Sequence, residues 1–130
     1  MKSIKFLISA ICLFFMFQVQ AQSVEKLKDK TPEERAKIQT EKMVEKLAIE
    51  GDLEMQVYAI NLKYAEAIEP LKDSEDSKVS KFQKLKSLSE DKNAEMEKVL
   101  TEDQFMAYLK MQEDMTKELK QNFRARRSSN

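Results

Sequence analysis

Closely spaced carboxylates are one set of side chains in this sequence that could support general acid–base catalysis. Acidic pairs occur at Glu33 and Glu34 and again at Glu102 and Asp103. Paired carboxylates act as general acid and base when their surroundings push the two pKa values apart. Both pairs stand at predicted helix starts, where the helix dipole favours the ionised form and solvent surrounds it. We therefore expect neither pair to transfer protons.

Methionines are the second candidate set. Met111 and Met115 lie one helical turn apart and could offer two thioether ligands to copper(I). The sequence has no His, and its one Cys is Cys12, so no imidazole or thiolate stands near them. Methionine also fills loosely packed cores and lines adaptable binding surfaces, and both roles stay open. We predict no metal site and no cofactor. After residue 21 the methionines are Met43, Met55, Met96, Met106, Met111 and Met115.

The sequence also lacks the residues that other kinds of catalysis usually need. The missing His removes the commonest general base. The single glycine, Gly51, cannot form a glycine-rich phosphate loop. No nucleophile and base are paired in any recognisable pattern. The sequence therefore predicts a binding protein and not an enzyme.

The first 21 residues have the pattern of a secretory signal peptide. Lys2 and Lys5 precede an almost unbroken apolar run over residues 6–17. This run is shorter than the roughly 20 apolar residues of a spanning helix, so we favour a cleaved signal over an uncleaved anchor, with cleavage between Ala21 and Gln22. Cys12 lies within the apolar run and would be removed with it. The remaining chain then has no disulfide.

Composition beyond residue 21 favours helices. The chain has 130 residues, which allows one domain. Without the signal, apolar residues fall to about 36% and charged residues rise to about 40%. β-Branched residues are few, whereas Glu, Lys, Leu, Met and Ala are frequent. The net charge becomes about −2, which argues against a dedicated nucleic-acid binder. We predict an all-α fold of about four amphipathic helices in an extended helical-hairpin arrangement.

Capping signals and apolar periodicity place the first two helices. Thr31, Pro32 and Glu34 form a helix start with a capping box. Gly51 stands where a left-handed C-terminal cap would fall, and Asp52 can cap the next helix. Pro70 should end or kink that second helix. Its apolar stripe is Leu53, Val57, Ile60, Tyr64, Ile68 and Leu71.

Two further helices follow a polar turn at residues 72–78. The third, over residues 79–99, carries Phe82, Leu85, Leu88, Met96 and Val99 on one side. The fourth starts at Thr101, with Gln104 closing a second capping box. Its predicted apolar face holds Phe105, Leu109, Leu119 and Phe123, with Tyr108, Met111 and Met115 beside it. We divide the chain into the signal (1–21), a flexible segment (22–30), a helical domain (31–124) and a basic tail (125–130).

Leu100, Thr101 and Gln104 spell the pattern LTxxQ. A secreted, His-poor helical chain with this motif resembles the Spy/CpxP family of periplasmic proteins, although the upstream copy is degenerate at Glu50 and Leu53. The resemblance implies a hairpin-like protomer, a cradle-shaped homodimer and a periplasmic location. It also implies ATP-independent holding of partly unfolded envelope proteins. The alternative is a regulatory adaptor of an envelope stress or metal-sensing system, although the metal sensors among these relatives depend on His ligands.

Apolar residues beside the main stripes give a hypothesis for the contact surface. Tyr58 and Leu62 lie off the stripe of the second helix, and Met111 and Met115 lie off that of the fourth. We expect these four residues to contribute to a shared apolar surface. Whether this surface is a dimer seam or a client-binding face stays open at this point. Partners are therefore unfolded or partner proteins and a second copy of the chain, with no nucleic acid and no integral membrane segment after signal cleavage.

Overall fold

The computed structural model describes residues 29–128, which form four α-helices and no strand. The predicted all-α fold is confirmed for this part of the chain. The signal peptide over residues 1–21 and nearly all of the segment 22–30 lie outside the described residues. In chain order the helices are α2 (Pro32–Leu47), α3 (Asp52–Lys72), α4 (Lys78–Val99) and α5 (Glu102–Ser128).

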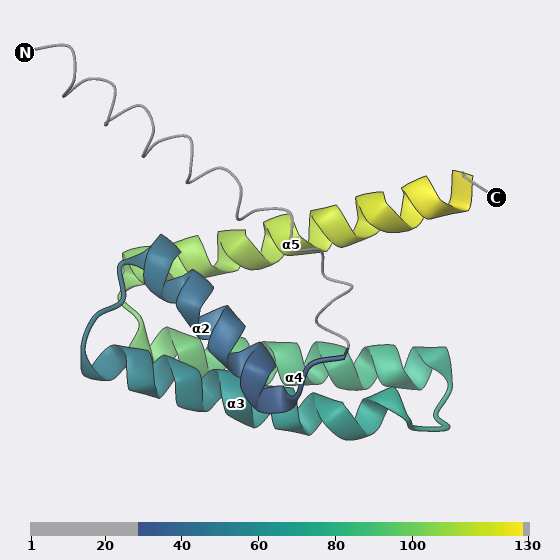
Figure 1. The fold of residues 1–130 in the computed structure, drawn as a ribbon, viewed down its shortest axis with the longest axis horizontal. Helices are drawn as coiled ribbons and strands as arrows, with labels where there is room; N and C mark the ends of the chain where they lie inside the picture. The colour runs from purple at the N-terminus through teal and green to yellow at the C-terminus, as the bar shows by residue number, and fades with distance from the viewer. Residues whose placement is uncertain (1–28, 129–130) are drawn as a thin grey trace, which may run out of the picture.

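The helices form a hairpin with two further helices laid against it. α3 and α4 run antiparallel and side by side, and α2 crosses them obliquely (Figure 1). α5 packs on α2 and α4 near its N-terminus. Its C-terminal turns stand clear of α3 and α4 in Figure 1. The fold is therefore packed at one end and open at the other.

The apolar core lies at the end where all four helices meet. It joins the second half of α2, the middle of α3, the last turn of α4 and the first turns of α5. Removing these side chains from water is the main force that holds the helices together. The buried cluster consists of Met43, Leu47, Ile49, Val57, Ile60, Tyr64, Met96, Leu100 and Tyr108.

Side-chain caps fix the starts of α2 and α4. The Thr31 side chain accepts a hydrogen bond from the Glu34 backbone N–H at 3.3 Å, and Glu34 accepts one from the Thr31 N–H at 3.0 Å. The predicted capping box, with Pro32 following Thr31, is therefore confirmed. Ser77 caps α4 by accepting from the Ser80 N–H at 3.2 Å. Both caps satisfy backbone donors that have no partner within the helix.

The prediction that Gly51 forms the left-handed cap of the first helix is wrong. Ala48 has that conformation, with φ 51° and ψ 47°, directly after Leu47. Gly51 is instead the N-cap of α3, at φ 61° and ψ −137°, and Asp52 is the first helical residue. Glycine suits this position because residues with a Cβ rarely adopt such dihedrals.

Pro70 does not end α3, and the predicted end of the last helix also differs from the structure. α3 continues through Pro70 and ends two residues later at Lys72. Pro70 cannot donate the backbone hydrogen bond to the Glu66 carbonyl, but only two helical residues follow it, so the loss is confined to the end of the helix. α5 continues to Ser128, so most of the segment 125–130 that we separated as a tail is helical.

The predicted apolar faces of α4 and α5 are only partly correct. Met96 is buried, and Leu88 and Val99 pack on the core, but Phe82 and Leu85 are exposed. Tyr108, which we placed beside the main stripe, is buried, whereas Phe123 is exposed. The physical reason is the one-sided core, which ends before it reaches the first half of α4 and the second half of α5.

Candidate functional site

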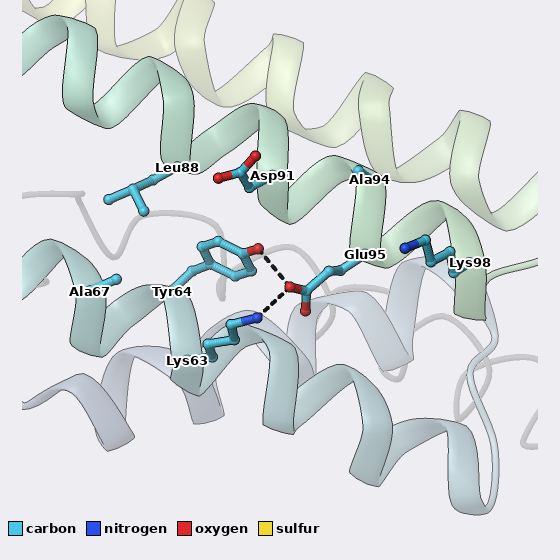
Figure 2. Close-up of a pocket in the computed structure, with 8 residues that line it drawn as sticks. All are labelled: Lys63, Tyr64, Ala67, Leu88, Asp91, Ala94, Glu95 and Lys98. Carbon is cyan, nitrogen blue, oxygen red and sulfur yellow. Dashed lines mark hydrogen bonds and ion pairs between the residues drawn. The ribbon is translucent and has the colours of Figure 1, made fainter.

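A shallow groove of about 400 Å³ runs between α3 and α4. Figure 2 shows Tyr64 from α3 pointing across it toward Glu95 on α4. The Tyr64 hydroxyl donates to Glu95 Oε1 at 2.8 Å, and Lys63 forms an ion pair with the same carboxylate. The Lys63 ammonium also lies 5.4 Å from the centroid of the Tyr64 ring. Ala67, Leu88, Asp91, Ala94 and Lys98 complete the lining.

The protonation states in this groove are fixed at neutral pH. Hydrogen bonds from Lys63 and then from Tyr64 lower the pKa of Glu95. Burial, followed by the hydrogen bond to Glu95, raises the pKa of Tyr64 to about 12. Glu95 therefore stays ionised and Tyr64 stays protonated across the physiological range. Such a pair can bind and orient a polar group, but it is poorly matched to general acid–base catalysis.

A polar contact joins α2 and α3 inside the core. The Asn61 amide nitrogen donates to Thr40 Oγ1 at 2.9 Å, and the Thr40 hydroxyl donates to the Ala36 carbonyl at 2.8 Å. Asn61 Oδ1 is buried without a hydrogen-bond partner in the structure. Sequence reasoning missed Asn61, although it lies four residues after Val57 and three before Tyr64. That spacing could have placed it on the apolar face of α3.

Lys92 is a second inward-facing polar residue that sequence reasoning missed. Its ammonium donates to Gln39 Oε1 on α2 at 2.9 Å. Burial lowers the pKa of Lys92 to about 8. The residue lies four positions from both Leu88 and Met96, so helical spacing could have revealed that it faces inward.

The LTxxQ residues form the junction between α4 and α5. Thr101 Oγ1 accepts from the Gln104 N–H at 3.2 Å, and Gln104 Oε1 accepts from the Thr101 N–H at 3.1 Å. Gln104 Nε2 also donates to the Leu47 carbonyl at the end of α2, at 3.3 Å. Leu100 is buried in the core. The motif thus caps α5 and attaches it to α2.

Replacing Thr101 with alanine should lower the free energy of unfolding by about 1 kcal/mol, because the start of α5 loses its side-chain cap. Urea denaturation followed by circular dichroism measures this change. The matched control is Thr116→Ala, in the middle of α5, where alanine is the better helix former. An equal loss of stability in both variants would contradict the capping role.

A known protein family matches the part of the chain that forms most of these helices. The family model described as "Domain of unknown function (DUF4890)" matches residues 21–108. The chain belongs to the DUF4890 family. The DUF4890 match covers α2, α3, α4 and the first turns of α5, and it ends at the core residue Tyr108. No match was found among the curated proteins or among the solved structures.

The four predicted contact residues are divided between two helices of the DUF4890 protein. Tyr58, Leu62, Met111 and Met115 are all half-buried. Met111 packs against the apolar core, whereas Tyr58, Leu62 and Met115 lie outside that cluster. α3 packs mainly on α2 and α4, and α5 packs on α2 and α4. The protomer therefore presents two separate pairs, on α3 and on α5.

The start of α4 carries an apolar segment whose exposure sequence reasoning missed. Val79 is 67% exposed and Phe82 is 66% exposed, and Leu85 follows on the next turn. We call these three residues the α4 apolar segment. No other helix of the described residues covers these side chains, so they stay exposed at this end of the α3–α4 hairpin.

Within residues 29–128, no group of three or more Cys, Asp or Glu side chains could hold a metal ion. Among the same residues, no helix has the length and apolar character needed to cross a membrane.

Proposed function

We propose that this DUF4890 protein binds partly unfolded proteins in the periplasm and holds them without ATP. The observation that carries the proposal is the α4 apolar segment, whose side chains face water in the protomer. Contiguous exposed apolar surface usually marks a site where another protein docks. An unfolded chain offers apolar side chains of mixed shape, which is the chemistry that such a surface accepts.

Two further features support this proposal. Met55 and Met106 are also exposed, and flexible thioether side chains adapt to partners of different shape. The LTxxQ residues stand at a helix junction, which is compatible with the resemblance to the Spy/CpxP family. That resemblance and the predicted signal peptide supply the periplasmic location.

A second copy of the chain is the partner that we propose for the middle of α5. Tyr108, Gln112, Met115 and Leu119 follow one another at spacings of four, three and four, which places them on one face of the helix. Tyr108 is buried in the core, whereas Met115 and Leu119 are half-buried beyond it. A twofold partner would extend the packing along this stripe.

Replacing both Val79 and Phe82 with serine should at least halve the suppression of client aggregation, because the main docking surface loses its apolar side chains. Light scattering of a chemically unfolded client, diluted into buffer without nucleotide, measures the effect. The melting temperature should stay within a few degrees of the wild type, since both side chains are exposed.

The matched control replaces Gln83 and Ser87 with alanine on the same helix, where both residues are exposed. This control should retain full suppression. Full suppression by the serine variant would contradict the assignment of the α4 apolar segment. Saturable binding of one specific partner, without suppression of several unrelated clients, would favour the regulatory adaptor.

A further inference from the structure

Charge is distributed unevenly along α5. Its first turns carry Glu102 and Asp103, and acidic residues recur at Glu113 and Asp114. Residues 117–128 contain five basic side chains and one acidic side chain. This segment follows the DUF4890 match, which ends at residue 108. The end of α5 is therefore a cationic helix beyond the matched region.

The cations are concentrated on one side of this helix. Lys120, Phe123, Arg124 and Arg127 are spaced i, i+3, i+4 and i+7, so they share one helical face. We call these four residues the basic–aromatic face. Glu118, the acidic residue of this segment, lies on roughly the opposite side. The basic–aromatic face thus combines positive charge with an aromatic ring.

This face is open to a large partner. Phe123 is 70% exposed, and all residues from Lys120 to Ser128 are exposed. A shallow hollow is lined by Phe123, Arg124, Arg126 and Arg127. In Figure 1 this end of α5 is separated from the helical hairpin, so the helix can lie along a flat surface without moving the core.

We propose that the basic–aromatic face docks on an anionic phospholipid surface. Guanidinium groups pair well with the phosphate oxygens of lipid headgroups. Phe123, placed among the cations, can enter the boundary between headgroups and acyl chains, as aromatic residues of interfacial helices do. The acidic first half of α5 would repel an extended nucleic acid, whereas a membrane touches only the end of the helix. Docking here leaves the α4 apolar segment free.

The test measures partitioning of the purified protein from Gln22 onward, the form expected after signal cleavage, onto phosphatidylglycerol–phosphatidylcholine vesicles by cosedimentation. Replacing Arg124 and Arg127 with glutamine should weaken partitioning about 25-fold, since each basic residue near an anionic surface contributes a factor of about five. Binding of the wild type should fall steeply between 50 and 500 mM salt, roughly as expected for screened charges. Pure phosphatidylcholine vesicles give the charge-independent baseline.

The matched control replaces Lys37 and Lys42 on α2 with glutamine, which removes the same charge from another exposed site. This control should bind as the wild type does. In a Phe123→Trp variant the new indole is the single Trp of the chain, and its emission should shift to the blue on anionic vesicles. Equal binding to both vesicle types, an equal loss in the control, or no emission shift would overturn the proposal. So would binding to polyglutamate or RNA without binding to vesicles.

Discussion

Replacing Lys92 with methionine is expected to raise the free energy of unfolding at pH 7 by about 2–3 kcal/mol. The Lys92 ammonium donates to the neutral amide oxygen of Gln39 and not to a carboxylate. The fold therefore holds a desolvated positive charge without a counter-charge at this contact, and burial lowers its pKa to about 8. Methionine has a similar length and no charge to desolvate.

The effect of Lys92 on the free energy of unfolding depends on pH. A lysine whose pKa is lowered in the folded state binds its proton more tightly when the chain is unfolded. The destabilisation is therefore complete below pH 8 and disappears as the pH rises toward 10.5. The wild type should gain about 2 kcal/mol between pH 7 and pH 9.5, whereas Lys92→Met should lack this gain. The raised pKa values of Tyr64 and Tyr108 act in the opposite direction above about pH 10, so the comparison stays below that pH.

Urea denaturation at the two pH values measures both effects. The control is Lys98→Met on the same helix, where the side chain is exposed and stability should change by less than about 0.5 kcal/mol. A Lys92→Met protein that is less stable than the wild type, or that retains the full pH dependence, would contradict the burial of this charge.

Replacing Met96 with alanine should lower the free energy of unfolding by about 3 kcal/mol. The Met96 side chain is completely buried in the cluster where α4 meets α3 and α5. Its removal loses apolar burial and leaves a cavity that the surrounding core residues fill only in part. For a domain of this size the melting temperature should fall by about 15 °C.

Met55→Ala is the matched control, since that methionine is 72% exposed. It should change stability by less than about 0.5 kcal/mol. Thermal denaturation followed at 222 nm compares the two variants. Similar small losses in both would show that Met96 does not lie in a tightly packed core.

Local signals in the sequence predict the helices well. Thr31 and Thr101 begin capping boxes because the residues that form each box are three positions apart in the chain. The left-handed cap at Ala48 could not be predicted in this way, because alanine does not favour that conformation. Gly51, which does favour it, lies only three residues later and was the expected cap. Helix starts were therefore easier to predict than the turn that ends α2.

Periodicity predicts which residues share a face, but not whether another helix covers that face. Phe82 and Met96 lie on the same predicted side of α4, yet one is exposed and the other buried. Asn61 and Lys92 face inward although they are polar, so a search for apolar stripes did not predict their positions. The candidate surface depends on where the core ends, which only the packing of all four helices determines.

We propose above all that the exposed apolar surface of this protein holds unfolded chains. The most direct measurement adds the purified protein to several unrelated unfolded clients, without nucleotide, and records aggregation by light scattering. We expect suppression of aggregation for each client, increasing with the ratio of protein to client. Undiminished aggregation of all the clients at a several-fold excess of the protein would contradict it.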